Sequence, residues 1–466
     1  MSEVDSAVQC PLESVQVSRT FRTLAERHGI PGAQLTIHHC GQTLEITFGV
    51  QQHGGGHPVG ANTAFPVGSI SKSFTAAVIM ILAADGDCEL DAPLGEVLPE
   101  LAGDNGSLES GAESGARLTL RQVLSHTSGL ASGPDSDDVA DLSLHRYVRH
   151  QCRLPDLVLR PGTGFSYSNV GYALAGRLIE TITGMTWWQA VGSILLKPLG
   201  IEPAFIPIPG GPTSERVIAT GHGVNAAAGK IVPVEQCLAW AEAPAGGLAL
   251  SATDLVRFGR ATFAEGTPGA LDLLPPDFAE ELRTPVPGAS AFGLADEWCP
   301  GLALFHEGDI DWLGHDGTAD GTSCHLRIEP GCGIAVALTT NSSAGVHLWR
   351  DLLAALRADG FPVGDHVAEL PDNTLPARSD CFGSYVNGDV EYRLLPIEDE
   401  GVGLAIDGEL LAELVLFEGL VFDLRDVFSG RRLQAGRFLP NPDTGELDRI
   451  QVLGRLASKR QESVRC

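Results

Sequence analysis

The sequence contains no apolar run of about 18 residues, the length that a membrane-spanning helix needs. Its N-terminal stretch lacks a basic segment followed by an apolar one, so it shows no sign of a secretory signal. Basic residues are scarce: 31 Lys and Arg stand against 59 Asp and Glu, which gives a net charge of −28. These absences predict a cytoplasmic protein that binds neither nucleic acid nor a membrane over any broad surface.

No C-x-x-C pair occurs among the ten cysteines, which are scattered from Cys10 to Cys466. In a reducing compartment, thiols spaced in this way are typical of small core residues and isolated side chains. His53 and His57 flank three glycines, and so flexible a loop does not hold two imidazoles in place. We therefore predict no metal site and no cofactor held by the protein itself.

The chain does have the length and the apolar content for more than one domain, with 466 residues of which 43% are hydrophobic. A helical pattern over 15–28 precedes two alternating segments, 32–39 and 43–49, whose short Gly-containing connection is typical of a hairpin. Two further strands are predicted over 322–328 and 333–340. Together these elements predict an α+β fold in which helices flank an antiparallel sheet.

The segment around Ser69 is the first candidate for catalysis. A glycine turn delivers Ser69 to a strongly apolar segment that ends at Gly86 and is predicted to be a buried helix. Lys72 follows three residues later, so hydroxyl and amine share one helix face and the amine can hold or take the proton of the hydroxyl. This S-x-x-K arrangement is typical of serine acyl-enzymes, although chance matches to four residues are common.

A second candidate is the loop that carries Tyr167 and Asn169, which comes just before a helix predicted over 173–181. Residues two apart on an extended segment point the same way, so a phenol and an amide are expected to face one space. A tyrosine beside a buried ammonium loses its proton more readily than in water, which makes Tyr167 a candidate general base. The alternative is a core tyrosine whose hydroxyl satisfies a backbone group.

Two glycine-containing segments complete the candidates. Gly246 and Gly247 are predicted to form a bend where the backbone approaches a ligand closely. A strand edge with Gly317 is predicted to accept an extended substrate, with the side chain of His315 facing the cleft. In the segment LSHTSGL, by contrast, a capping and bracing role is favoured for His126 and its neighbours.

These motifs, in this order and at these separations, resemble the serine β-lactamase and penicillin-binding-protein superfamily over roughly residues 15–362. The similarity includes the phrases LSHTSGL, PGTGFSYSNVGY, LLKPLGI, PAGGLALSATDL and GHDGTADG. The resemblance implies a β-lactamase/transpeptidase-like sheet flanked by helices and an all-helical subdomain. It also implies that Ser69 is the nucleophile and that Lys72 and Tyr167 form the proton relay.

The same resemblance implies that Asn169 contacts a substrate amide and that the backbone amides of Ser69 and Thr318 form the oxyanion hole. His315 stands where many members of the superfamily have a lysine. That exchange is shared with esterase-like and amidase-like branches, and it weakens the expectation of carboxylate binding in the manner of a β-lactamase.

The run GMTWWQAVGSILLKPLGIEPAF and the C-terminal extension are similar to those of penicillin-binding-protein-type thioesterases. In that family the serine attacks a linear peptidyl thioester on the phosphopantetheine arm of a peptidyl carrier protein of a nonribosomal peptide synthetase. The N-terminal amine of the peptide then resolves the peptidyl-enzyme head to tail, usually at a D-residue donor end. An amine outcompetes water only if it is held close, so a partly dry cleft is expected.

The organisation predicted from the sequence is a catalytic domain over 1–369, a linker over 370–379 and a C-terminal domain over 380–466. Seven short alternating segments predict a small antiparallel barrel, which in the resembled family is lipocalin-like; they span 382–385, 390–395, 403–406, 410–416, 420–423, 437–439 and 449–453. Arg455 near the end is a candidate to meet a peptide carboxylate or backbone, with a solvated surface arginine as the alternative.

The densest basic segment of the catalytic region is 145–153, which contains Arg146, Arg149 and Arg153. Because carrier proteins are generally acidic, we interpret it as part of a carrier-docking rim, with an ordinary solvated helix face as the alternative. The sequence thus favours a serine peptide cyclase or hydrolase. A β-lactamase-fold esterase, D-aminopeptidase or β-lactamase without a carrier partner, or a binding module without catalysis, are the alternatives.

Overall fold

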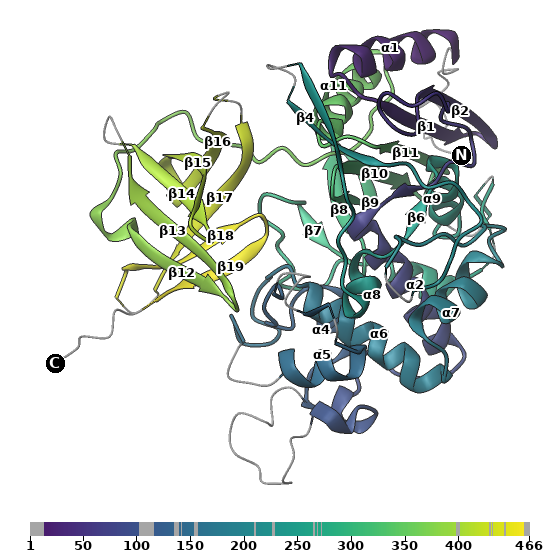
Figure 1. Cartoon of the computed structure of the whole chain (residues 1–466). Helices are drawn as coiled ribbons and strands as arrows, with labels where there is room; N and C mark the ends of the chain where they lie inside the picture. The colour runs from purple at the N-terminus through teal and green to yellow at the C-terminus, as the bar shows by residue number, and fades with distance from the viewer. Residues whose placement is uncertain are drawn as a thin grey trace, which may run out of the picture.

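The computed structural model describes residues 14–101, 116–134, 139–140, 142–152, 157–208, 211–225, 229–263, 266–267, 269–271, 273–397, 401–427, 430, 432–441 and 444–460. Figure 1 shows two parts, a large region of sheet and helices and a C-terminal β-barrel beside it. Arg153, part of the predicted docking segment, lies outside the described residues. In the described part of the chain, no helix combines the length and the apolar character needed to cross a membrane.

A seven-stranded antiparallel sheet forms the centre of the large region, in the order β2-β1-β11-β10-β9-β8-β7. Its strands are β1 Gly32–His39, β2 Gln42–Gly49, β7 Glu297–Trp298, β8 Ala303–Glu307, β9 Ile310–Ala319, β10 Thr322–Glu329 and β11 Ile334–Thr340. The predicted hairpin is present: Cys40 and Gly41 join β1 to β2 with φ angles of 50° and 74°, the left-handed pair that a tight two-residue turn requires.

Helices cover both faces of this sheet. The α-helices of the large region are α1 Ser14–Arg27, α2 Ser71–Ala84, α4 Leu120–Leu124, α5 Leu144–Gln151, α6 Asn169–Thr183, α7 Trp187–Ala190, α8 Ala243–Gly246, α9 Ala252–Arg260, α10 Pro276–Glu281 and α11 Gly345–Ala358. Along β11, Val336 and Leu338 pack with α1 and α11, whereas Ala335 and Ala337 pack in the cluster that contains α9. This alternation follows from the two-residue period of a strand, and it explains why β11 is buried throughout.

Helices α6 and α8 pack against α2, and α4, α5 and α7 pack against α6, which gives the helical part seen in the lower half of Figure 1. Almost every side chain of α2 is buried, including Phe74, Ile79 and Met80. A helix that is apolar on all sides is stable only when other elements enclose it. Two-stranded sheets also occur, β3 Phe65–Pro66 with β6 Ala249–Leu250 and β4 Gly221–Asn225 with β5 Lys230–Val234.

The C-terminal part is a closed antiparallel barrel of eight strands. They are β12 Gly383–Asn387, β13 Val390–Pro396, β14 Val402–Ile406, β15 Glu409–Leu416, β16 Val421–Asp426, β17 Arg432–Pro440, β18 Leu447–Val452 and β19 Arg455–Lys459. The first seven correspond to the predicted segments, whereas β19 was missed because it is short and carries polar residues at both ends. It closes the barrel by pairing with both β18 and β12.

The predicted fold class is therefore confirmed: an α+β region with an antiparallel sheet, flanking helices and a helical part, followed by a small antiparallel barrel. One helix prediction differs in its limits: the helix expected over 173–181 begins earlier, at Asn169.

Candidate active site

Ser69 lies in the 3₁₀ turn Gly68–Ile70, directly before α2, and its side chain is partly exposed. Gly68 has φ 52°, and a Cβ atom at this position would lie 2.2 Å from the carbonyl oxygen of Thr318. Only glycine fits so close to another backbone. This glycine therefore lets the nucleophile turn lie against β9.

Lys72 is fully buried, one turn into the helix beneath Ser69. Its Nζ donates to the Oγ of Ser69 at 3.2 Å and to the carbonyl oxygen of Ala245 at 2.9 Å. The same nitrogen lies 5.0 Å from the centre of the Tyr167 ring and 5.6 Å from that of Tyr172. The amine is thus held at the nucleophile by groups from three separate segments of the chain.

Burial lowers the pKa of Lys72 well below its ordinary value, and the positive charge of Arg455 lowers it further, while Glu242 acts in the opposite direction. Burial raises the pKa of Tyr167 to about 12, although its interaction with Ser69 and the charge of Arg455 oppose this rise. The sequence-based expectation that the phenol ionises readily is therefore wrong. Lys72 is the group whose proton is easily lost, and Tyr167 is a neutral phenol.

Tyr167 and Asn169 lie at the junction between a loop and α6. Tyr167 is buried, with only 7% of its surface exposed, whereas Asn169 is the first residue of the helix and is half-buried. Ser168 between them caps α6 by accepting from the backbone N–H of Gly171 at 3.1 Å. The side chain of Ser69 interacts with the phenol, so Ser69, Lys72 and Tyr167 meet as predicted from the sequence.

His315 lies on β9 with its ring centre 6.3 Å from that of Tyr167 and 5.3 Å from that of Trp298. Its Nδ1 donates to the carbonyl oxygen of Asp316 at 2.6 Å, which leaves the buried Nε2 as a lone-pair acceptor. Burial and the nearby charge of Lys72 lower the pKa of His315 to about 4. The ring is therefore neutral at pH 7 and does not replace the cation that a lysine would supply.

The edge of β9 beyond His315 is the expected place for an extended substrate. Strand β8 pairs with β9 only as far as Gly314, so the next residues have a strand neighbour only on the β10 side. Gly317 fits against the nucleophile turn, because a Cβ there would lie 1.9 Å from the carbonyl oxygen of Val67. Thr318 is exposed at the same edge, and its backbone meets that of Gly68, next to Ser69. The two amides expected to form an oxyanion hole thus come from adjoining segments.

Gly246 and Gly247 end the short helix α8, and the short strand β6 follows at Ala249. A Cβ on Gly246 would meet only ordinary contacts, whereas one on Gly247 would lie 2.9 Å from the carbonyl oxygen of Ala243. The close approach at Gly247 is thus to its own helix. The contribution of this segment to the site is the carbonyl oxygen of Ala245, which accepts from Lys72.

Arg455 reaches the site from the barrel, and its guanidinium carbon lies 5.3 Å from the centre of the Tyr167 ring. Its charge lowers the pKa values of Lys72, Tyr167 and His126. Arg455 is half-buried, so it is not an ordinary surface arginine. The site therefore has a cation on the barrel side.

Two residues that the sequence did not mark as part of the site enclose Tyr167. The ring of His126 lies 4.2 Å from that of Tyr167, and Trp298 lies 5.3 Å from His126. The Nδ1 of His126 accepts from the backbone N–H of Ser168 at 3.1 Å, which agrees with the bracing role expected for this segment. Trp298 lies in an irregular two-residue strand, so periodicity gave no signal for it.

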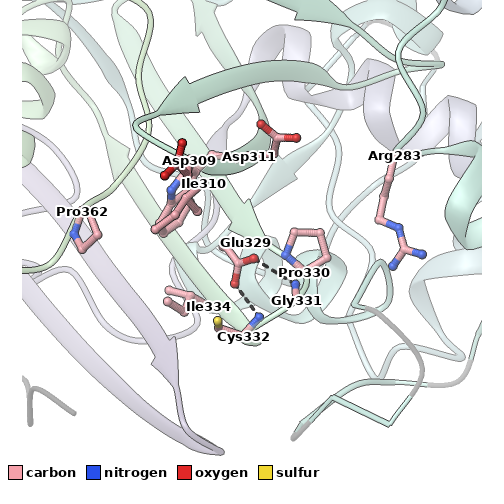
Figure 2. Close-up of a pocket in the computed structure, with 11 residues that line it drawn as sticks. Arg283, Asp309, Ile310, Asp311, Glu329, Pro330, Gly331, Cys332, Ile334 and Pro362 are labelled. Carbon is pink, nitrogen blue, oxygen red and sulfur yellow. Dashed lines mark hydrogen bonds between the residues drawn. The ribbon is translucent and has the colours of Figure 1, made fainter. Parts of the chain in front are cut away.

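A separate cavity of about 390 Å³ lies at the other end of β9 and β10 from His315 and Gly317 (Figure 2). Its lining combines apolar side chains with acidic ones, among them Ile310, Ile334, Asp309 and Glu329. It contains none of the residues predicted for catalysis. Among the described residues, no three His, Cys, Asp or Glu side chains gather in a way that suits a metal ion.

Residues 17–358 match the model of the β-lactamase family, which is well over half of the chain. The chain belongs to the β-lactamase family. It is therefore a β-lactamase-fold serine hydrolase.

Within this family, penicillin-binding protein 4 of Amycolatopsis lactamdurans is 31% identical over 350 residues, which cover 74% of this chain and 90% of that protein. A β-lactamase of Providencia stuartii is 28% identical over 250 residues, 53% of this chain and 59% of that protein. The crystal structure of SurE is similar over 96% of this chain and 99% of its own, with 38% identity and a TM-score of 0.82. A second structure, SurE with D-Leu, gives 37% identity and a TM-score of 0.80 over the same shares. The similarity to SurE thus includes the barrel.

Proposed function

We propose that this protein takes a peptidyl group from a carrier-bound thioester onto Ser69 and releases it by head-to-tail macrolactamisation, or by hydrolysis when water attacks instead. The carrier is the peptidyl carrier protein of a nonribosomal peptide synthetase, with the peptide on its phosphopantetheine arm. The observation that carries the proposal is the position of Arg455, a barrel residue, over the ring of Tyr167. The similarity to SurE over both parts of the chain supports it.

The first half-reaction forms an ester at Ser69. The Oγ of Ser69 attacks the thioester carbonyl and passes its proton to neutral Lys72, 3.2 Å away. The backbone amides of Ser69 and Thr318 stabilise the oxyanion, and the thiolate leaves with a proton relayed through Lys72 and the neutral phenol of Tyr167. The lowered pKa of Lys72 favours this sequence, because it increases the fraction of the amine that can accept a proton.

The second half-reaction breaks that ester. The N-terminal amine of the peptide attacks the carbonyl, its proton passes to Lys72, and the Oγ of Ser69 leaves and takes that proton back from Lys72. Lys72, Tyr167 and His315 are all buried, so the base and its surroundings are largely shielded from water. A shielded site favours an amine that is held close over bulk water.

The substrate would lie along β9, with Gly317 at the open edge and Asn169 at the amide of the donor residue. Because His315 is neutral, Arg455 is the cation available to a carbonyl or carboxylate of the peptide. The structure of SurE with D-Leu supports a D-residue as the acyl donor here.

The carrier protein would dock near α5. Arg146 and Arg149 are exposed on this helix, which packs beside α6, the helix that begins at Asn169 (Figure 1). His145 is less available to a partner, because its Nδ1 lies 3.2 Å from the buried carboxylate of Glu100. An acidic carrier complements the arginines in a protein whose net charge is otherwise −28.

The function is tested with a synthetic peptidyl thioester that has a D-residue at its C-terminus. A product one water lighter than the free acid, together with an acyl-enzyme on Ser69 in the intact mass, is the expected result. Ser69→Ala should abolish both, and Ser193→Ala, which changes an exposed serine, should retain both. Free acid as the sole product, at rates no better than those for small esters, would favour an esterase or hydrolase instead.

Docking is tested separately by reversing Arg146, Arg149 and Arg153 to Glu. The KM for carrier-bound peptide should rise, while the KM for a small thioester mimic stays unchanged. Arg19→Glu with Arg22→Glu is the control, because these exposed residues lie on α1, on the far side of the large region from α5 (Figure 1). An equal loss on both substrates would contradict docking at α5.

A further inference from the structure

The segment from Phe165 to Ser168, which carries Tyr167, is held from two sides. From the catalytic region, His126 accepts from the backbone N–H of Ser166 at 2.9 Å and from that of Ser168 at 3.1 Å. From the barrel, the carbonyl oxygen of Gly454 accepts from the backbone N–H of Tyr167 at 3.0 Å. The barrel thus binds the backbone of the catalytic tyrosine itself.

A second pair of contacts comes from the strands on either side of Gly454. The Nε2 of Gln451 on β18 donates to the carbonyl oxygen of Phe165 at 3.3 Å. The backbone N–H of Leu456 on β19 donates to the Oγ of Ser166 at 3.2 Å. Gly454 itself is closely packed, since a Cβ there would lie 2.2 Å from Leu294 and 3.3 Å from Phe165. The β18–β19 hairpin therefore packs on the catalytic region in one defined position.

Asn387, at the end of β12, connects the two parts through its side chain and is fully buried. Its Oδ1 accepts from the backbone N–H of Ser132 at 2.7 Å. Its Nδ2 donates to the carbonyl oxygen of Leu456 at 2.6 Å and, more weakly, to the Oγ of Ser166 at 3.4 Å. Three of the four hydrogen bonds that an amide side chain can form are thus used, and two of them, to Ser132 and Ser166, cross this interface.

Ser132 connects Asn387 to the active site. Its carbonyl oxygen accepts from the backbone N–H of Asn169 at 3.0 Å, and its Oγ lies 3.5 Å from the carbonyl oxygen of Tyr167. Ser132 is therefore the one residue through which hydrogen bonds connect the side chain of Asn387 to the backbones of Tyr167 and Asn169.

We propose that Asn387 is a positioning residue for Tyr167 and Asn169, and that the barrel is thereby a structural part of the active site. This rests on the acyl-enzyme role given above to Ser69 and Tyr167. Without the amide, the buried N–H of Ser132 and the carbonyl of Leu456 lose their partner, and the segment around Ser166 loses one of its anchors. A displacement of the phenol by about 1 Å is enough to lower the rate of a positioned proton transfer about 100-fold.

The test measures the rate at which a small p-nitrophenyl ester acylates Ser69 in the full-length protein. This rate is divided by the concentration of active sites, which is determined by fluorophosphonate labelling. Asn387→Ala should lower the acylation rate about 10- to 100-fold with little change in the KM for the ester. Tyr385→Phe is the matched control, because it removes a buried hydrogen bond to the carbonyl of Cys381 inside the barrel without touching the catalytic region. This control should lose thermal stability but keep the native acylation rate.

Ser166→Ala keeps the proposal testable if Asn387→Ala folds poorly. It removes the acceptor of Leu456 and of Asn387 by a small change in the catalytic region, and it should lower the rate in the same direction. If Asn387→Ala and Ser166→Ala both acylate at the native rate per labelled site, the proposal is overturned. An equal decrease of the acylation rate in Tyr385→Phe would overturn it as well. Absence of cyclic product from the native protein would instead contradict the cyclase function and leave this measurement intact.

Discussion

The Nζ of Lys72 lies 3.2 Å from the Oγ of Ser69, and the same nitrogen donates to the carbonyl oxygen of Ala245 at 2.9 Å. The amine has no exposed surface, and burial holds its pKa well below the ordinary value. The pair is therefore suited to proton transfer from the hydroxyl, at the expense of keeping an ionisable group out of water.

Replacing Lys72 by Met is expected to abolish acylation and to raise the melting temperature at pH 7. An amine whose folded pKa is lowered makes folding less favourable below that pKa, and this penalty fades as the pH rises toward 10.5. The stability gain of the variant, about 1 kcal/mol or more at neutral pH, should therefore shrink in alkaline buffer. Thermal unfolding of both proteins from pH 7 to pH 10 checks this. A gain that does not depend on pH would contradict it.

Tyr167→Phe should lower kcat by a factor of about 10² to 10⁴, because the phenol relays the proton to the leaving group. Since the pKa of Tyr167 is about 12, the native profile of kcat/KM should show no phenol ionisation below about pH 11. Tyr172→Phe is the control: its ring also lies close to Lys72, but its hydroxyl donates to the carbonyl of Leu124. Similar decreases of kcat in both variants would contradict a specific role of the Tyr167 phenol.

The neutral state of His315 predicts an unusual dependence of stability on pH. Its folded pKa of about 4 lies below the ordinary 6.5, so the unfolded chain binds the additional proton as the pH falls. Between pH 6.5 and pH 4 the native protein should lose about 3 kcal/mol through this residue. In His315→Gln, the free energy of unfolding measured in urea should fall by correspondingly less between these two pH values. An identical pH dependence in the two proteins would disprove the assignment.

Arg327 is expected to be among the most sensitive positions for stability. It is fully buried behind His315, pairs with Asp316 at 2.7 Å and Asp365 at 2.5 Å, and lies 3.9 Å over the ring of Phe305. Arg327→Met removes the guanidinium from both carboxylates, of which Asp316 keeps only His325 at 2.8 Å, and should cost about 3–5 kcal/mol. The partly exposed Arg357, paired with Glu307, is the comparison, and Arg357→Met should cost about 1 kcal/mol or less through that pair. Guanidinium unfolding followed by tryptophan fluorescence measures both.

The predictions that succeeded depend on local patterns. Ser69 and Lys72 share a face because they are three residues apart on a helix, and the strands β1, β2, β10 and β11 follow from alternation and turn glycines. The barrel strands were found for the same reason, except β19, whose five residues have too few apolar positions to mark a strand. The predicted charge state of Tyr167 was wrong because burial, which the sequence does not show, raises its pKa by more than the hydrogen bond with Ser69 and the charge of Arg455 lower it.

The sequence by itself determined the order of the motifs, the type of each part of the fold and the place of Ser69 and Lys72 at the start of one helix, because these depend on neighbours within about one helical turn or one strand. Only the tertiary structure decided which groups are buried and hence which of them holds the proton. It alone also brought Arg455, Gly454 and Asn387 from the barrel to Tyr167, more than 200 residues away along the chain. No periodicity encodes such a contact, since it arises only when two separately folded surfaces pack together.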